Sequence, residues 1–251
     1  MKKNVVKIMV FIVLSQISLL QAQDTIKMYT FYTPSHVQFK DIWVNSLKDE
    51  GIETIIKEFP QECKTGKTWD DGWEKTMLHK VDMILGAIDT NWGEVVIYSD
   101  IDIEFFQPIS KKIIELIGNK DLIIQRDNPS GVVCAGFFAF RANERMRLLW
   151  KGIRNYMVSR NECSDQKTLN RLLRKSNGND LNPYGVVWDY LPADFLGGGT
   201  FTGKSWKIGN KLFIPSNIMM LHANCTRGNK NKLALLSYVR EVVEQRRSKE
   251  I

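Results

Sequence analysis

Two aspartates, Asp100 and Asp102, stand at the carboxyl end of Val95–Ser99, a strand-like run that is mostly apolar and β-branched. Side chains two positions apart on an extended chain share a face, so these two carboxylates can converge on one object. Ligands bind at the carboxyl ends of strands in open α/β sheets. Hard oxygen donors there suit Mg²⁺ or Mn²⁺, which keeps coordination positions open for phosphate oxygens. The pattern predicts a metal–phosphate site, with two solvated aspartates as the alternative that so short a motif leaves open.

Two further places carry residues capable of chemistry. His222 closes the apolar run Ile218–Leu221. A histidine there is commonly a structural residue, but an imidazole beside carboxylates and phosphate oxygens is also a reasonable ligand for Mn²⁺. Asp165 and Gln166 begin an amphipathic helical pattern, where an aspartate is by default a helix cap. Both places therefore have a structural and a functional interpretation.

Strand-like and helix-like segments alternate through the first half of the chain, which indicates βαβ units and a mainly parallel sheet flanked by helices. Strands are expected at Ile26–Phe31, Glu53–Phe59, Val95–Ser99, Leu122–Ile124 and Val132–Phe140. Helices are expected at Pro34–Glu50, Trp73–Ile88, Pro108–Ile117, Asn143–Val158 and Asp165–Arg174. No internal repeat or linker interrupts the pattern, so we expect one α/β domain over residues 24–251.

The N-terminus has the pattern of a targeting segment. Lys2 and Lys3 precede the apolar run Ile8–Leu20, which is shorter than the roughly 20 residues that span a bilayer. We expect residues 1–23 to be a signal peptide cut near Ala22, or a short membrane anchor. The protein would then be exported or membrane-associated, in the lumen of the secretory pathway if the host is a eukaryote.

Composition limits the remaining classes. The 251 residues are enough for one substantial core, and 43% hydrophobic with 25% charged residues excludes a disordered chain or a fibre. The net charge of +7 is compatible with an anionic partner, but its densest cluster, Arg240–Lys249, is more typical of a solvated helix face than of a nucleic-acid reader. No nucleic-acid partner is expected. The four cysteines allow three full disulfide pairings, among which the sequence does not choose.

The order of five motifs resembles the nucleotide-diphospho-sugar transferase family of GT-A glycosyltransferases. The motifs are Lys80, VVIYSDIDIEFFQPI at 95–109, CAGFFAFRAN at 134–143, Asp165-Gln166, and LPADFLGGG at 191–199 with LHANCTRGNK at 221–230. The resemblance covers nearly the whole chain after residue 23 and implies a single domain of the GT-A-like (Rossmann-like) fold. Cys134 stands two places before Gly136, where the family usually carries a polar residue, often Asn, and this departure bears on sugar selectivity.

The resemblance also implies an activity: metal-dependent transfer of a hexose or pentose from a nucleotide-diphosphate donor to a hydroxyl of a glycan, glycoprotein or glycolipid, with retention. Asp100, Asp102 and His222 would hold Mn²⁺ or Mg²⁺. Asp165 and Gln166 would lie beside the sugar ring, where an oxygen could stabilise or attack an oxocarbenium-like transition state. Substrate contacts are implied for Tyr32 and Thr33 at the base, Lys80, Gly136, Asp194 as an acceptor-side base, Asn224, and Lys230 at the diphosphate. Lys230 could also be an ordinary exposed cation, and Lys232, two residues later, leaves the register of this lysine open.

Two other functions fit parts of the sequence. A haloacid-dehalogenase-type phosphatase would use Asp100 as nucleophile and Asp102 as general acid, with Asp189 and Asp194 as a late acidic pair. A secreted basic module for acidic glycans would be no enzyme, and it leaves the aspartates unexplained. Asn224-Cys225-Thr226 is moreover a glycosylation sequon. A glycan there would block the metal loop, so we expect a buried, unmodified asparagine or a host that does not glycosylate.

Overall fold

The computed structural model describes residues 25–66, 69–173, 175–176, 179–180, 182–198 and 205–249. The expected signal peptide or anchor, residues 1–23, lies outside this part, as does the last glycine of the 191–199 motif. Among the helices described, none combines the length and the apolarity that crossing a membrane requires.

Six strands form the central sheet, in the order β2-β1-β3-β6-β5-β9. Their bounds are β1 Ile26–Tyr32, β2 Ile52–Glu58, β3 Val95–Ser99, β5 Leu122–Arg126, β6 Val133–Arg141 and β9 Trp188–Tyr190. Neighbouring strands are parallel except at β6, which is antiparallel to both β3 and β5. The predicted mainly parallel sheet is confirmed, with one reversed strand that the sequence analysis did not predict.

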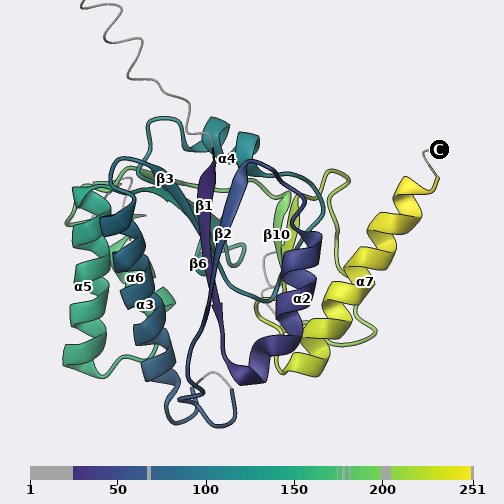
Figure 1. The fold of residues 1–251 in the computed structure, drawn as a ribbon, viewed down its shortest axis with the longest axis horizontal. Coiled ribbons are helices and arrows are strands. Elements are labelled where there is room, and N and C mark those ends of the chain that lie inside the picture. The colour runs from purple at the N-terminus through teal and green to yellow at the C-terminus, as the bar shows by residue number, and fades with distance from the viewer. Residues whose placement is uncertain are drawn as a thin grey trace, which may run out of the picture.

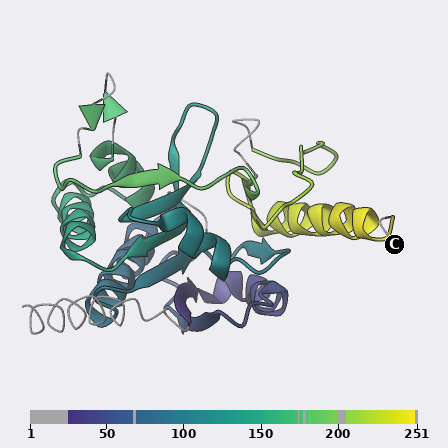
Figure 2. The same ribbon diagram turned by 90° about the horizontal axis from the view of Figure 1, so that it is seen from above.

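Helices cover both faces of this sheet (Figure 1). One face carries α3 (Trp73–Thr90), α5 (Glu144–Arg160) and α6 (Asp165–Leu172). The other carries α2 (Val37–Ser46), α4 (Ser110–Ile117) and α7 (Asn229–Arg247). Seen from above, α7 lies along the edge of the molecule remote from α5 (Figure 2).

The remaining strands are short. A second sheet has the order β10-β11-β4 and lies on the α7 side; its strands are β10 Phe195–Gly197, β11 Met220–His222 and β4 Ile103–Phe105. A two-stranded sheet joins β7 (Lys175–Ser176) to β8 (Asn179–Asp180), and a 3₁₀ turn, η1, spans Pro34–His36. The second sheet matters most for function because β4 follows directly after Asp102 and β11 ends with His222.

Strand β3 is buried along its whole length. Val95 and Ile97 pack into the hydrophobic cluster on the side of α2, α4 and α7, whereas Val96 and Tyr98 pack into the cluster on the side of α3, α5 and α6. A strand covered on both faces needs apolar residues at every position. This explains why residues 95–98 are hydrophobic at every position and why the predicted bounds of the strand agree with the structure; the buried Ser99 at its end accepts a hydrogen bond from Trp43 Nε1 at 2.9 Å.

The expected helix Pro34–Glu50 is divided and shorter. η1 ends at His36, α2 follows, and the chain leaves the helix at Leu47, which has extended backbone angles of φ −77° and ψ 93°. Near this end the Ser46 hydroxyl donates to the carbonyl of Trp43 at 3.1 Å, a local bond of the kind that competes with helix continuation.

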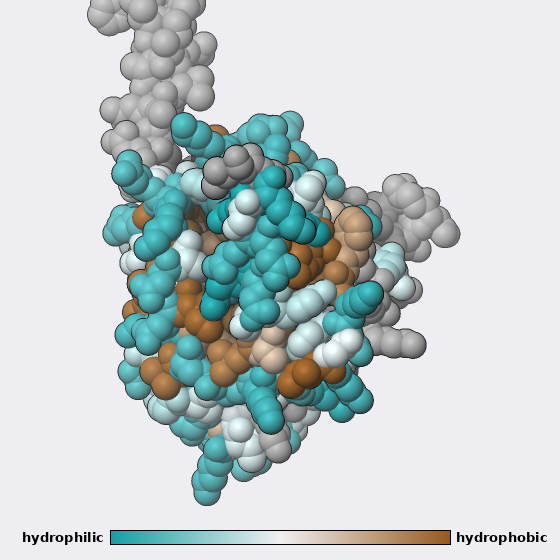
Figure 3. All heavy atoms as spheres, turned by 90° about the vertical axis from the view of Figure 1, so that its right-hand side faces the viewer, coloured by the Kyte–Doolittle hydropathy of each residue, from teal (hydrophilic) through white to brown (hydrophobic). Residues whose placement is uncertain are grey.

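The molecular face bearing α2 and α7 is largely hydrophilic, with smaller hydrophobic areas between the polar side chains (Figure 3).

Candidate active site

The two aspartates lie in the turn between β3 and β4. The carbonyl of Asp102 accepts from the N–H of Ala223 at 3.0 Å, which ties this turn to the end of β11. Strand β11 runs antiparallel to β4, with His222 opposite Ile103. His222 is thus brought beside Asp102 across 120 positions of sequence, and backbone pairing, not side-chain attraction alone, holds the two together.

Asp100, Asp102 and His222 form a compact group in which one ligand atom from each residue lies within 4.8 Å of the others. His222 Nε2 is 3.3 Å from Asp102 Oδ1 and 3.7 Å from Asp100 Oδ2. Two hard carboxylates and one imidazole are a donor set that suits Mn²⁺ and also Mg²⁺. The residues present therefore fit a divalent cation of the kind expected from the sequence.

Lys232, on the first turn of α7, forms an ion pair with Asp102 Oδ2. Burial alone would raise the pKa of Asp102, but Lys232 and His222 outweigh it and hold that pKa well below its usual value. For His222, burial disfavours the imidazolium, yet Cys134 and Asp102 raise its pKa to about 10. A cation that binds Nε2 must therefore displace a proton.

A second ionic group lies on the α3 side of the aspartates. Lys80 Nζ is 2.9 Å from Asp165 Oδ2 and 3.5 Å from Asp100 Oδ1, and it donates to the carbonyl of Ala135 at 2.8 Å. Burial would lower the pKa of Lys80, but the two carboxylates reverse this and raise it. The hydroxyl of Tyr98 also donates to Asp100 Oδ1, at 2.6 Å. Lys80 is a permanent cation that fixes both carboxylates.

Helix α6 supplies Asp165 and Gln166, the two predicted catalytic residues. Its cap is Ser164, whose hydroxyl oxygen accepts from the N–H of Lys167 at 3.1 Å. Asp165 is therefore not needed as a cap, and its buried carboxylate faces Lys80 instead. The side-chain oxygen of Gln166 accepts from the N–H of Ala135 at 3.0 Å. Both side chains line the same cleft as the aspartates.

Gly136 leaves the space that this arrangement needs. Its carbonyl accepts from the N–H of Asp100 at 2.6 Å. A Cβ at position 136 would overlap with His222 Cε1 and would lie 2.6 Å from Asp100 Oδ2. Only glycine lets β6 approach the aspartate and the histidine so closely.

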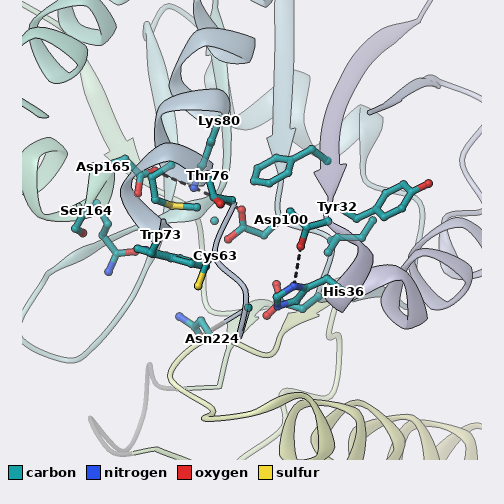
Figure 4. A pocket seen from close by; sticks show the side chains of 18 of the residues that line it. Tyr32, His36, Cys63, Trp73, Thr76, Lys80, Asp100, Ser164, Asp165 and Asn224 are labelled. Carbon is teal, nitrogen blue, oxygen red and sulfur yellow. Dashed lines mark hydrogen bonds and ion pairs between the residues drawn. The ribbon is translucent and has the colours of Figure 1, made fainter. Parts of the chain in front are cut away.

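One cleft of about 290 Å³ contains all of these groups. In Figure 4, Asp100 lies near its centre, with Lys80, Asp165, Trp73 and Ser164 on one side and Tyr32 and His36 on the other. The predicted residues that line it are Tyr32, Thr33, Lys80, Asp100, Asp102, Gly136, Asp165, Gln166, His222 and Asn224. The structure thus brings together side chains from β1, α3, β6, α6 and β11.

The end of β1 forms the second side of the cleft. Tyr32 is mostly buried, and its hydroxyl donates to Glu58 at 2.8 Å, so that its polar end is already bonded. The Thr33 and Ser35 hydroxyls lie 3.3 and 2.9 Å from His36 Nδ1. His36 has no evident role in the sequence, yet it lines the cleft. Its position four residues after the end of the first strand is the only signal that could have indicated it.

Two predicted residues lie elsewhere. Lys230 is exposed and does not line the cleft, whereas Lys232 does. The lysine beside Asp100, Asp102 and His222 is therefore Lys232. Asp194 precedes β10; it lies outside the cleft lining, and its carboxylate accepts from Asn217 at 3.4 Å. Asp194 is thus not among the side chains around Asp100, and its role as an acceptor-side base stays a prediction.

The sequon asparagine is buried. Asn224 is 8% exposed, and its amide donates to Asp127 at 2.8 Å and to Cys134 Sγ at 3.6 Å. An amide nitrogen held in this way is not presented to a glycosylating enzyme, which agrees with the first of the two expectations from the sequence. The four cysteines are free thiols.

Comparison with known proteins identifies the family. A family model for nucleotide-diphospho-sugar transferases matches residues 41–236, which is most of the chain. The protein belongs to this family. No curated protein sequence matches the chain. Membership makes this nucleotide-diphospho-sugar transferase a glycosyltransferase and confirms the predicted resemblance.

Solved structures agree on the fold of the transferase. The glycosyltransferase GlyE of Streptococcus pneumoniae TIGR4 has a TM-score of 0.52 and 13% identity, over 90% of this chain and 64% of its own. A glycosyltransferase involved in glycosylation of the major capsid of PBCV-1 has a TM-score of 0.54 and 11% identity, over 85% and 99%. The galactosyltransferase LgtC, solved with donor and acceptor sugar analogs, has 0.51 and 10%, over 82% and 88%. At these identities the likeness shows the GT-A fold.

The alternatives lose their support. In a phosphatase, Asp189 and Asp194 would join Asp100 at the site, but Asp189 is exposed on β9 and neither residue lines the cleft. A basic glycan-binding module leaves unexplained why this cleft gathers the carboxylates of Asp100, Asp102, Asp127 and Asp165 beside Lys80 and Lys232. The family and the geometry of the site both favour the transferase over these two alternatives.

Proposed function

We propose that the protein transfers a sugar from a nucleoside-diphosphate donor to a hydroxyl acceptor in this cleft, with a divalent cation and with retention of configuration. The observation that carries the proposal is the convergence of Asp100, Asp102 and His222 next to Lys232, at the carboxyl end of β3, in a chain of this family. Acidic ligands and a lysine side by side suit a metal-bound diphosphate.

Asp100, Asp102 and His222 would hold Mn²⁺ or Mg²⁺. When bound, the cation supplies positive charge that stabilises the diphosphate as the bond to the sugar breaks. Lys232 takes the role that the sequence analysis gave to Lys230: its ammonium lies at the metal group and can donate to the departing diphosphate. It now pairs with Asp102, and a phosphate oxygen would replace that partner.

The sugar lies towards Asp165 and Gln166. The electron pair of the bond between the anomeric carbon and the phosphate oxygen leaves with the diphosphate. The acceptor oxygen forms the new bond, and its proton passes to an oxygen of the departing diphosphate. Because Lys80 fixes Asp165 at 2.9 Å, this carboxylate is held in place to stabilise positive charge on the ring. Gln166 already uses its oxygen for the N–H of Ala135, so it presents its amide N–H groups to the sugar hydroxyls.

The two ends of the cleft would bind the nucleoside of the donor and the acceptor. Thr33 and His36, at the end of β1, contribute polar groups to the nucleoside. Trp69 and Trp73 also line the cleft, and Trp69 is 61% exposed. Their rings offer apolar surface to a sugar acceptor, which we place in a glycan, glycoprotein or glycolipid. The apolar run in residues 1–23 supports export or membrane association.

Binding and hydrolysis of the donor test this function. Nucleoside diphosphates with different bases should bind in the presence of Mn²⁺ and lose that binding in excess chelator. A panel of hexose and pentose donors should include one that is slowly hydrolysed to free sugar. Asp102→Asn should abolish both, because a neutral amide is a poorer ligand for a hard cation. Asp82→Asn, which removes a carboxylate from an exposed ion pair with Arg154, is the control.

Two kinds of result would contradict this proposed function. Metal-independent activity in chelator, or full activity in Asp102→Asn, would contradict the metal site. Trapping of Asp100 by beryllium fluoride, with no metal-dependent binding of any nucleoside diphosphate, would instead indicate phosphatase chemistry.

A further inference from the structure

Gln125 lies behind His222 and is not part of the cleft lining. It belongs to β5 and is 1% exposed. Its Nε2 donates to the carbonyl of Phe195 at 3.0 Å, and its Oε1 lies 2.9 Å from His222 Nδ1. Gln125 thus connects a strand of the central sheet to His222 through a buried amide, which can control the orientation and the protonation of the imidazole.

The bond to Phe195 fixes which end of the amide faces the histidine. A backbone carbonyl can only accept, so the NH₂ group must point to Phe195 and the oxygen must point to His222. An amide oxygen can only accept, so His222 Nδ1 must carry a proton. In the reversed orientation, the amide oxygen would face the carbonyl oxygen of Phe195. The NH₂ group would then face the proton on Nδ1, so that two donors would meet.

Cys134 supports the same assignment. Its sulfur is 3.6 Å from His222 Nδ1 and also accepts from the Asn224 amide at 3.6 Å. A sulfur can accept weakly from a proton on Nδ1, so this contact is compatible with the assignment that Gln125 makes. Gln125 Oε1, at 2.9 Å, is the stronger partner because it is closer and is an oxygen.

We propose that Gln125 is a positioning residue for the metal: it holds the proton on Nδ1 and so directs the lone pair of Nε2 towards the cation. Nε2 is the nitrogen that faces Asp102 and Asp100, at 3.3 and 3.7 Å. Groups that hold the second nitrogen of a metal-binding histidine fix its tautomer and ring orientation, and their loss commonly costs 10–100-fold in metal affinity. The inference rests on the proposed function, since it requires that His222 binds a metal.

Calorimetric titration with Mn²⁺ tests this without any substrate. Gln125→Met removes both polar ends of the amide at similar length, and the Mn²⁺ dissociation constant should rise about 10–100-fold. Gln125→Glu keeps an oxygen facing Nδ1, so Mn²⁺ should bind as tightly as in the wild type or more tightly. Gln107→Met is the matched control because Gln107 also donates to a backbone carbonyl, that of Ile218 at 2.9 Å, without touching the site.

Nitrogen-15 NMR of the Mg²⁺-loaded protein gives a second readout. Only three histidines are present, and His222 should show a proton on Nδ1 in the wild type and in Gln125→Glu. In Gln125→Met that proton should exchange more rapidly with water, because its acceptor at 2.9 Å is gone.

The outcomes separate the two proposals. If the wild type binds no Mn²⁺, the proposed metal site itself fails. If the wild type binds and a folded Gln125→Met binds equally well, or if Gln125→Glu is weakened as much as Gln125→Met, Gln125 has a structural role only and the inference is overturned. Thermal unfolding of each variant shows whether it is folded.

Discussion

Substitution of Gly136 should displace the proposed metal ligands while leaving the rest of the fold in place. Gly136→Ala would press a methyl group against His222 Cε1 and Asp100 Oδ2. One of these ligands must move, so Mn²⁺ affinity should fall at least about tenfold, measured by calorimetry. Gly86→Ala is the control: position 86 lies in α3, where an added Cβ meets no atom within 4 Å. It should leave Mn²⁺ binding unchanged and stabilise the fold by up to about 1 kcal/mol.

Lys232 and Lys230 form a matched pair for the diphosphate. Lys232→Met removes the ammonium that contacts Asp102, and a hydrogen bond to a charged group contributes about 1.5–3 kcal/mol. The affinity for a nucleoside diphosphate with Mn²⁺ should therefore fall about 10–100-fold. Lys230→Met, on the exposed side of the same helix, should change it less than about twofold. Equal losses in the two variants would show that α7 contributes only general positive charge.

At the scale of elements, the start of α4 depends on a side chain from another loop. Asp49 Oδ2 accepts from the N–H groups of Ile109 and Ser110 at 2.6 and 2.7 Å, and its Oδ1 accepts from the Ser110 hydroxyl at 2.7 Å. It also accepts from the N–H of Gly51 at 3.0 Å. Burial would raise the pKa of Asp49, but these hydrogen bonds together lower it below its ordinary value of 3.8. The charged form is therefore the one that stabilises the fold.

The pH dependence of stability follows from this direction. A depressed folded pKa gives stability that is present above the unfolded value of 3.8 and is lost as the pH falls through the folded pKa. Asp49→Asn should lower the free energy of unfolding by about 1 kcal/mol at pH 7, as for loss of a helix cap. The difference from wild type in urea unfolding should shrink below about pH 3.8. Asp41→Asn, an exposed substitution on α2, should show no such difference.

Elements with strong local patterns were predictable, and this includes most of the central sheet. Strand β3 needs apolar residues on both faces, which leaves a clear signal, and its bounds Val95–Ser99 were predicted correctly. The direction of β6 was not, because an unbroken apolar run carries no sign of which way it enters the sheet. The three-residue strands β4 and β10 are too short for a period of two to be visible.

The lysine of α7 shows why part of the site could not be assigned. Helix α7 begins at Asn229, and two residues apart on a helix differ by about 200° in direction. Lys230 and Lys232 must therefore point to opposite sides, but the sequence does not fix the phase of the helix. Packing of Leu235, Leu236 and Val239 into the core fixes it and turns Lys232 inward. Gln125 likewise has no local signal, since its role arises only from contact with distant residues.

At the scale of the whole molecule, the site joins segments that are far apart in the chain. Asp100 and Asp102 follow β3, Lys80 lies on α3, and His222 and Lys232 come from β11 and α7. The site exists only when the central sheet and the C-terminal part are docked together. Ligands that bind it therefore stabilise the entire fold, because they bind the native chain and not the unfolded one.

Ligand-dependent unfolding measures this linkage. At one hundred times its dissociation constant, a ligand adds about 2.7 kcal/mol, and each kcal/mol shifts Tm by about 2–4 °C at this chain length. Mn²⁺ together with a nucleoside diphosphate should thus raise Tm by about 5–11 °C, whereas the nucleoside diphosphate in excess chelator should raise it much less. Asp102→Asn should lose the combined shift while Asp82→Asn keeps it. A full shift in chelator would mean that the nucleotide binds this cleft without the metal, and that Asp102 serves only to neutralise Lys232.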